Sequence, residues 1–409
     1  MNVVIAGGGI AGVTAAEAAR AVDPKANITV FSLERDRLYF RPRLPEVVAG
    51  KVSQDKIFVH PETWYREKNI ELRLGESLIE VCQDNHQLRG SLGSRQTYDR
   101  LLLATGAESF RPPLPGANLP GVFAVRRLTD AANLYYETSR AQAAVLVGSG
   151  LLGLEIGHAL TLRGLKVHVL ERSDRVLPRQ TTPKSGAKLL GLLTKMGFEI
   201  HLGQQASRAF GQERFSGVIL ASGEEILSQI LILATGVTPN LDLAKALGLK
   251  VERAIVVDEY LETSTQDIYA AGDCAQSPDG FTGLWTVSRL MGLTAGANLM
   301  AQDRGTRKVY RPQPPSSFLK VAGIDLIAAG DLDPDGRLTG VEAETETSYR
   351  KVVVNATGLL VGFTNLGSTN GNRELTEALG QKVLPPAILG ELSQVDFDFA
   401  KIKSLPLSA

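Results

Sequence analysis

The chain has 409 residues, more than one hydrophobic core usually supports, so two or three domains are expected. Lys and Arg together number 44, as do Asp and Glu, and this formal charge of zero argues against non-specific nucleic-acid binding. The apolar runs are strand-sized, too short for a membrane span, and no secretory signal follows Met1. With only Cys82 and Cys274, a disulfide framework is not expected, and a cytoplasmic location fits.

The first motif is a glycine fingerprint, Gly7-Gly8-Gly9-Ile10-Ala11-Gly12, directly after the apolar residues 3–6. A helix-compatible stretch follows to about residue 22. Between a strand and a helix, this pattern predicts dinucleotide binding, with Gly7, Gly9 and Gly12 allowing the tight turn and the close approach of a pyrophosphate. A second strand is expected over residues 28–32. Glu34 follows it, 22 residues after Gly12, near the distance at which an acid binds a ribose hydroxyl, although acids also end strands at solvated loops.

Three further segments complete the first unit. The stretch 39–45 carries two prolines and is expected to be irregular. Residues 98–103 predict a buried strand that runs into the turn Ala104-Thr105-Gly106, and residues 112–116, rich in proline, predict a linker.

The second fingerprint is Gly148-Ser149-Gly150-Leu151-Leu152-Gly153, after a strand expected over residues 143–147. The next expected strand, 166–170, ends at Glu171, 18 residues after Gly153. A carboxylate there repels the 2′-phosphate of NADPH and therefore favours NADH. Arg172 and Arg175 argue the other way, because arginines can accommodate that phosphate.

The second unit repeats the plan of the first. An expected strand over residues 230–233 ends in Ala234-Thr235-Gly236, as the first unit ends in its own Ala-Thr-Gly turn. Two complete dinucleotide units predict two bound dinucleotides. The economical pair is a flavin and a nicotinamide, one passing electrons to the other.

The composition changes after residue 237. Residues 268–271 predict a strand that ends in Gly272-Asp273, where small residues let a ligand approach and the acid can bond a polyol hydroxyl; a helix N-cap is the structural alternative. A helix is expected over about 283–302, and residues 312–315 predict a proline-rich linker. The last hundred residues alternate apolar and polar positions, which predicts a small α+β domain.

Together, these motifs resemble the FAD-dependent pyridine nucleotide-disulfide oxidoreductases of the glutathione-reductase-like fold. The chain looks most like the NADH:rubredoxin reductases and the flavin domain of NAD(P)H nitrite reductases, on the segments 39–46 and 319–326. The resemblance implies an α/β fold with two Rossmann-like dinucleotide-binding domains and a small α+β C-terminal domain. It places the FAD-binding domain at 1–111 and 237–311, the NAD(H)-binding domain at 112–236 and the C-terminal domain at 312–409.

The resemblance also implies residue roles. For FAD these are Gly7, Gly9 and Gly12 at the pyrophosphate, Glu34 at the adenosine ribose, Arg41 and Pro42 along the isoalloxazine, Ala104-Thr105-Gly106 at the turn, and Gly272-Asp273 at the ribityl or pyrophosphate. For NADH they are Gly148, Gly150, Gly153, Glu171 and Gly236, with Glu155 near the nicotinamide. No catalytic side chain is expected, because the cofactors carry the chemistry.

Some family features are missing. Many relatives carry a lysine near the position of Glu46, and others have Glu-Gln where this chain has Leu290-Met291 before Gly292. Disulfide reductases of this fold need two cysteines at short spacing, and its thiol peroxidases need one in the first forty-odd residues; Cys82 and Cys274 fit neither pattern. The five histidines, His60, His86, His158, His168 and His201, show no metal-binding spacing, so no metal is expected.

The favoured function is that of an enzyme, an NADH-dependent FAD oxidoreductase that passes electrons to an external acceptor such as rubredoxin. Two alternatives remain open. The acceptor is oxygen or a small molecule in one, and in the other the chain is a flavin-bearing subunit or redox-sensing module of a larger complex. A homodimer is compatible with each of these functions.

Overall fold

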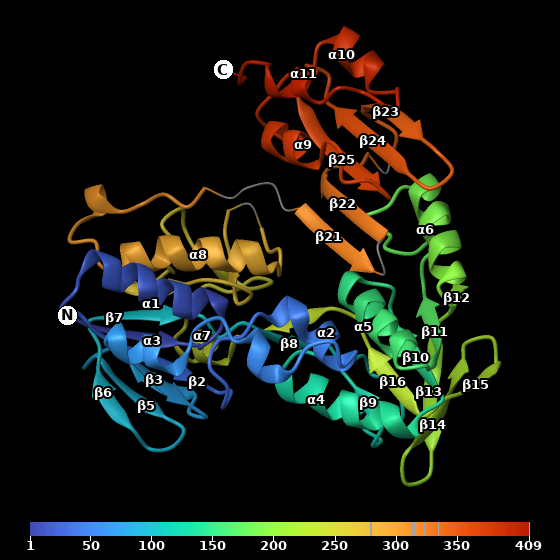
Figure 1. Ribbon diagram of the computed structural model, residues 1–409. Helices are drawn as coiled ribbons and strands as arrows, with labels where there is room; N and C mark the ends of the chain where they lie inside the picture. Colours follow the sequence, from blue (N-terminus) through green and yellow to red (C-terminus); the bar gives the residue numbers. More distant parts are fainter. Residues whose placement is uncertain (279, 312–315, 322–323, 334, 409) are drawn as a thin grey trace. The chain divides into compact units, whose positions relative to one another are not determined.

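The computed structural model describes residues 1–278, 280–311, 316–321, 324–333 and 335–408 (Figure 1). It divides into two compact units. Unit 1 contains Met1–Leu44, Val52–Ser109 and Val237–Gln313, and unit 2 contains Pro45–Lys51, Phe110–Gly236 and Pro314–Ala409. Each unit is therefore assembled from segments that are far apart in the sequence. Among the described residues, no helix is long and apolar enough to cross a membrane.

Unit 1 is built on a parallel five-stranded sheet. In spatial order its strands are β19 (Ile268–Ala270), β7 (Arg100–Leu103), β1 (Asn2–Ala6), β2 (Asn27–Ser32) and β3 (Ile70–Leu74). Except for the edge strand β3, which carries Glu71 and Arg73, the strands are short, mostly apolar and largely buried, as expected for a parallel sheet covered on both faces. β2 lies on one side of β1 and β7 lies on the other, so the order in which the strands are added reverses direction at β1. In sheets of this kind, ligands bind beyond the carboxyl ends of the strands at the point of reversal.

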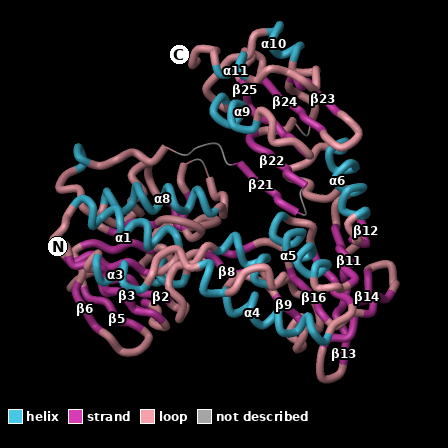
Figure 2. Tube along the Cα trace, viewed as in Figure 1, coloured by secondary structure: helices cyan, strands magenta, loops and turns pink. Residues whose placement is uncertain are grey.

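Two helices lie side by side against this sheet in unit 1, α1 (Ile10–Val22) and α8 (Trp285–Asn298) (Figures 1 and 2). Glycines of α8 allow their close approach. A Cβ at Gly292 would lie 2.4 Å from the Ala11 carbonyl oxygen, and one at Gly296 would lie 2.3 Å from that of Ala15. The helix predicted over 283–302 is thus present but shorter at both ends.

The segment 39–45, expected to be irregular, is mostly helical, so that prediction was wrong. A 3₁₀ helix, Arg41–Arg43, runs directly into α2 (Leu44–Val48). Both prolines, Pro42 and Pro45, fall in the first turn of their helix. The missing proline N–H costs nothing there, because first-turn N–H groups have no intrahelical partner.

The other elements of unit 1 are small. They are the antiparallel strands β4 (Leu78–Cys82), β5 (Gln87–Gly90) and β6 (Arg95–Thr97), the pair β8 (Ala107–Ser109) and β17 (Val237–Pro239), the pair β18 (Ile255–Val256) and β20 (Ala275–Gln276), the helices α3 (Glu62–Glu67) and α7 (Asp242–Ala246), and the 3₁₀ helices Gln54–Ile57 and Arg304–Thr306.

Unit 2 contains a second parallel sheet with the same plan. Its spatial order is β12 (Phe198–Leu202), β11 (Lys166–Glu171), β10 (Ala143–Val147), β16 (Ile230–Leu233) and β9 (Val122–Phe123). The strand before the fingerprint is again central, between the following strand and the strand that leads to Ala-Thr-Gly. Its helices are α4 (Leu128–Glu137), α5 (Leu151–Leu162) and α6 (Pro183–Lys195), with a 3₁₀ helix at Thr138–Arg140. The strands β13 (Ala206–Gly211), β14 (Phe215–Leu220) and β15 (Glu225–Leu227) form an antiparallel sheet.

The C-terminal part of unit 2 is a five-stranded antiparallel sheet with short helices. Its strands, in chain order, are β21 (Ser316–Val321), β22 (Ile324–Gly330), β23 (Thr339–Glu344), β24 (Tyr349–Val354) and β25 (Leu360–Leu366), and its helices are α9 (Asn372–Ala378), α10 (Pro386–Glu391) and α11 (Ala400–Lys403). Side chains of β24 and β25, such as Val352 and Phe363, share a buried core with α9 and α11. The predicted α/β fold class with an α+β C-terminal part is confirmed. The predicted linker at 312–315 lies outside the described residues.

Candidate functional site

The first fingerprint forms a tight loop between β1 and α1. Gly7 has φ +130°, and a Cβ there would lie 2.0 Å from the Ala104 carbonyl oxygen. A Cβ at Gly12 would lie 1.9 Å from the Gly7 carbonyl oxygen. At Gly9, in contrast, apart from Gly9 itself and its chain neighbours, no described atom lies within 4 Å of a Cβ. The loop is therefore packed on the protein side and open at Gly9.

The open side faces the beginning of α1. Gly9 is the N-cap of this helix and offers no side chain to its first N–H groups. Unpaired N–H groups and the positive end of the helix dipole form an anion site at such a terminus. By comparison, α6 is capped by its own sequence, since Thr182 Oγ1 accepts a hydrogen bond of 3.2 Å from the Ser185 N–H. The open, uncapped start of α1 fits a dinucleotide pyrophosphate.

The second fingerprint repeats this geometry in unit 2. Gly148 has φ +101°, and its Cβ would lie 2.6 Å from the Ala234 carbonyl oxygen. A Cβ at Gly153 would lie 2.8 Å from the Gly148 carbonyl oxygen, whereas the nearest atom to one at Gly150 is 3.8 Å away. The helix α5 also starts without a side-chain cap. Unit 2 therefore holds a second cradle of the same kind.

The threonines of the two Ala-Thr-Gly turns fasten backbone segments. Thr105 Oγ1 donates to the Asn240 carbonyl oxygen at 3.0 Å, and Asn240 Nδ2 donates back to the Thr105 carbonyl at 2.8 Å. Thr235 Oγ1 donates to the Phe110 carbonyl at 2.9 Å. Gly106 and Gly236, with φ +68° and +105°, make the turns themselves. Their predicted contacts with the cofactors stay predictions.

Glu34 follows β2 and is held by two neighbours. Its carboxylate accepts a hydrogen bond of 2.6 Å from Tyr39 Oη and one of 3.0 Å from Arg41 Nη2. The sequence did not single out Tyr39, although an aromatic hydroxyl five residues after a strand-end acid was the available signal. Within the described chain, Arg41 Nε is buried without a hydrogen-bond partner. A buried N–H without a partner is costly, and a bound ligand oxygen would satisfy it.

Asp273 lies beside the first cradle. The preceding Gly272 has φ +81°, and its Cβ would lie 2.8 Å from the Ala11 Cβ in the first turn of α1. Asp273 Oδ1 accepts a hydrogen bond of 2.8 Å from Ser288 Oγ of α8. The residues after it form a turn and the strand β20, so no helix starts at Asp273. The strand end is a better fit to the ligand interpretation of Asp273 than to the N-cap alternative.

Glu171 is bonded to the second fingerprint itself. Its Oε2 accepts from the Ser149 N–H at 3.0 Å and from Ser149 Oγ at 2.6 Å, and its Oε1 accepts from the Ser173 N–H at 2.8 Å. Burial alone raises the pKa of Glu171, but these hydrogen bonds outweigh it and hold the pKa below its usual value. The carboxylate is therefore charged at neutral pH. Ser149, which sequence reasoning missed, stands where the first fingerprint has Gly8.

The two arginines that follow Glu171 in the sequence differ in the hydrogen bonds and ion pairs that they make. Arg175 pairs with Asp174 at 2.8 Å and also donates to the carbonyls of Pro178 and Thr181. Arg172 is exposed and makes no hydrogen bond or ion pair with any described residue. Only Arg172 is thus uncommitted. Glu155 is half-buried on α5.

Neither cysteine resembles a redox thiol. Cys274 is fully buried, and its Sγ donates to the carbonyls of Leu103 and Ala271 at 3.3 and 3.4 Å. Burial raises the pKa of this thiol, which disfavours the reactive thiolate. Cys82 is a half-buried free thiol on β4. Cys274 is therefore a packed residue.

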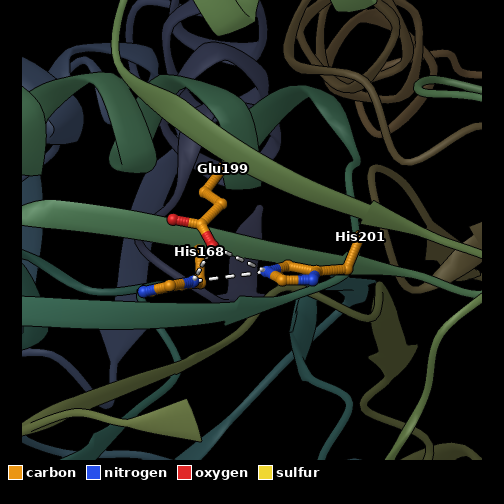
Figure 3. Close-up of side chains that lie close together, drawn as sticks. All are labelled: His168, Glu199 and His201. Atoms are coloured by element: carbon orange, nitrogen blue, oxygen red, sulfur yellow. Dashed lines mark hydrogen bonds and ion pairs between the residues drawn. The ribbon is translucent and has the colours of Figure 1, made fainter.

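The histidines contain one group that the sequence did not reveal. His168 on β11 and His201 on β12 lie with Glu199 on neighbouring strands, all three ligand atoms within 4.8 Å of one another (Figure 3). The sequence spacing of the histidines did not reveal this group, because strand pairing joins residues 33 positions apart. The expectation that no metal binds stays a prediction, to which this cluster offers an alternative.

Comparisons with known proteins agree with this geometry. Residues 1–298 match the family model described as pyridine nucleotide-disulphide oxidoreductase. The chain is 31% identical to an NADH oxidase of Methanocaldococcus jannaschii, over 100% of this chain and 97% of that protein. It is 30% identical to a rubredoxin-NAD(+) reductase of Ectopseudomonas oleovorans, over 84% of this chain and 91% of that protein.

Among solved structures, the NADH:rubredoxin oxidoreductase of Clostridium acetobutylicum is 26% identical, with a TM-score of 0.78 over 92% of this chain and 94% of the other. The family match spans most of the chain and covers both glycine cradles. The chain therefore belongs to the pyridine nucleotide-disulphide oxidoreductase family and is an oxidoreductase that uses FAD and NAD(H).

Proposed function

We propose that the chain oxidises NADH and delivers the electrons to a small redox protein of the rubredoxin type. The observation that carries this proposal is the pair of matching cradles, one in each unit, together with the absence of a suitably placed thiol pair in the described chain. FAD, when bound, would supply the redox chemistry: it would take a hydride from NADH and pass the electrons on to the acceptor. The protein's own part is to bind and orient both dinucleotides.

In unit 1, the residues fit the flavin dinucleotide. We assign the pyrophosphate to the open loop at Gly9 and the N–H groups of α1, with Asp273 beside it. Glu34 binds the adenosine ribose, because each carboxylate oxygen can accept more than one hydrogen bond. The resemblance implies that Arg41 and Pro42 lie along the isoalloxazine. Because Arg41 is paired with Glu34, we propose instead that its guanidinium lies toward the adenosine, and we keep the isoalloxazine assignment for Pro42 alone.

In unit 2, the residues fit NADH. The pyrophosphate lies at Gly150 and the start of α5, and Glu171 accepts a ribose hydroxyl. Glu155, one turn into α5, lies toward the nicotinamide. The C-terminal sheet β21–β25 is the surface we assign to docking of the acceptor protein.

A second function is favoured by a specific observation, the full-length similarity to an NADH oxidase. In that case oxygen reoxidises the protein. Stopped-flow reoxidation after NADH reduction separates the two functions. Faster reoxidation by an oxidised iron protein such as ferric rubredoxin, which becomes ferrous as it accepts the electron, supports the proposal, and faster reoxidation by oxygen supports the oxidase.

The purified protein is expected to be yellow and to release one FAD per chain on denaturation. FMN is not expected in the extract, because it lacks the adenosine that Glu34 would hold. Chromatography of the extracted flavin measures it. An extract containing FMN, or no flavin, contradicts the assignment of the first cradle.

Replacing both Cys82 and Cys274 with Ser is expected to leave turnover from NADH to the acceptor largely intact. A hydroxyl at position 274 can donate to the same two carbonyls that the thiol now contacts. A dithiol relay would need the two sulfurs about 2 Å apart when oxidised, which an unpaired buried thiol does not provide. Steady-state turnover is measured beside FAD content. Lost turnover with unchanged FAD content and unchanged NADH reduction would restore a thiol relay.

A further inference from the structure

The strongest unassigned group of side chains is the cluster of His168, Glu199 and His201 in unit 2 (Figure 3). His168 and Glu199 are paired in register on the parallel strands β11 and β12, and His201 lies two residues beyond Glu199. All three side chains therefore project from the same face of the sheet. His168 is buried, His201 is half-buried and Glu199 is exposed.

The distances in the cluster are close to those of ligands around one metal ion. His168 Nδ1 and His201 Nε2 share a hydrogen bond of 3.2 Å, and Glu199 Oε1 lies 3.6 Å from the first and 3.9 Å from the second. Neighbouring ligands of a tetrahedral zinc, at bond lengths near 2.0–2.1 Å, are about 3.3 Å apart. At these distances the Glu199 carboxylate oxygen makes no good hydrogen bond to either ring. A small movement of Glu199 toward the two imidazoles would bring all three ligand atoms to the spacing of a tetrahedral site.

The Glu199 carboxylate is also oriented for this role. Lys166 Nζ holds its other oxygen, Oε2, at 2.7 Å, which leaves Oε1 directed at the two imidazoles. Outer partners of this kind commonly fix the ligand atoms of metal sites. Two imidazoles with one carboxylate favour borderline transition ions over Mg²⁺ or Ca²⁺, which prefer oxygen ligands.

We propose that His168, Glu199 and His201 bind a divalent first-row transition ion such as Zn²⁺, with water in the remaining position. The site is separate from both glycine cradles in its residues. A metal ion bound there would link β12, the edge strand of its sheet, to the neighbouring strand β11. It would therefore stabilise the pairing of the edge strand with the rest of the sheet. A metal that binds only the folded state stabilises that state, and the stabilisation rises with the logarithm of the ratio of metal concentration to Kd.

The test is calorimetric titration of ZnCl₂ into the flavin-containing protein, without an affinity tag and after treatment with EDTA. One Zn²⁺ per chain is expected. His201→Asn and Glu199→Gln, which avoid the buried His168, should each weaken binding by at least about tenfold. His86→Asn is the matched control: it removes an exposed histidine of unit 1 at a position with φ +51°, which Asn tolerates, and should leave binding unchanged.

MgCl₂ should give no binding at this site. The rate of flavin reduction by NADH, which needs the second cradle in unit 2, is measured on every variant and separates loss of metal binding from loss of fold in that unit. The proposal is overturned if the unaltered protein binds no Zn²⁺, or if His201→Asn and His86→Asn bind it equally.

Discussion

Gly9→Ala is expected to abolish FAD binding while unit 1 stays folded. Apart from Gly9 itself and its chain neighbours, no described atom lies within 4 Å of a Cβ at this position, so the methyl group meets only the space assigned to the pyrophosphate. Loss of two charge-assisted hydrogen bonds from the start of α1, each worth roughly 1.5–3 kcal/mol, weakens FAD binding by about a hundredfold or more. The ratio of flavin to protein absorbance after purification, followed by titration with FAD, measures the effect.

Gly150→Ala is the matched variant in the second cradle. It should retain FAD and lose rapid reduction by NADH, because Gly150 has the same open position in unit 2. Gly7→Ala, in contrast, should impair folding, since its Cβ would lie 2.0 Å from a carbonyl oxygen at a φ of +130°. Normal FAD content in Gly9→Ala, with an unchanged melting curve, would contradict the placement of the pyrophosphate.

The two-cradle architecture could be predicted from the sequence because its determinants are local. The glycines, the preceding apolar strand and the following helix are contiguous, and each is required by backbone geometry rather than by distant contacts. In both units the first glycine of the fingerprint lies close to the backbone of the Ala-Thr-Gly turn, at Ala104 in one and at Ala234 in the other.

The partners of the site acids could not be predicted in the same way. Arg41 bonds Glu34 from the start of a 3₁₀ helix, and Tyr39 bonds it from two residues before that helix. The two prolines within 39–45 predict irregular chain, whereas the first turn of a helix accepts proline. Side-chain contacts across a turn depend on its exact dihedral angles, which composition does not specify.

The histidine cluster shows a second limit. Metal-binding spacing in a sequence is recognisable when the ligands share one element, but His168 and His201 meet only through the register of β11 and β12. A shift of one residue would turn His201 and Glu199 to the opposite face. The burial of Phe198, which faces the other side of the sheet, favours that register, and burial is a tertiary property.

The unaltered protein is expected to use NADH roughly ten- to a hundredfold more efficiently than NADPH. Glu171 is charged and buried beneath the second fingerprint, where it is fixed by three hydrogen bonds and cannot move away from a 2′-phosphate. An unrelieved charge clash or an unsatisfied buried group costs about 1–3 kcal/mol, which corresponds to that ratio. Kinetics of flavin reduction with each nucleotide give the ratio of kcat/KM values.

Glu171→Gln is the informative variant, because it keeps the shape of the side chain and removes its charge. An arginine at this position would also break the bonds to Ser149 and Ser173 and disturb the loop. Glutamine should lower efficiency with NADH, raise it with NADPH and so narrow the preference.

Glu34→Gln is the matched control at the equivalent strand end of unit 1, and it should weaken FAD binding without changing the nucleotide ratio. Arg172→Ala tests the opposing influence, since Arg172 is the arginine near the site that no described residue engages. If the unaltered protein used NADPH as well as NADH, and Arg172→Ala restored a preference for NADH, the arginine rather than Glu171 would determine specificity. If Glu171→Gln left the ratio unchanged, the carboxylate would serve only to hold Ser149 and the fingerprint loop in place.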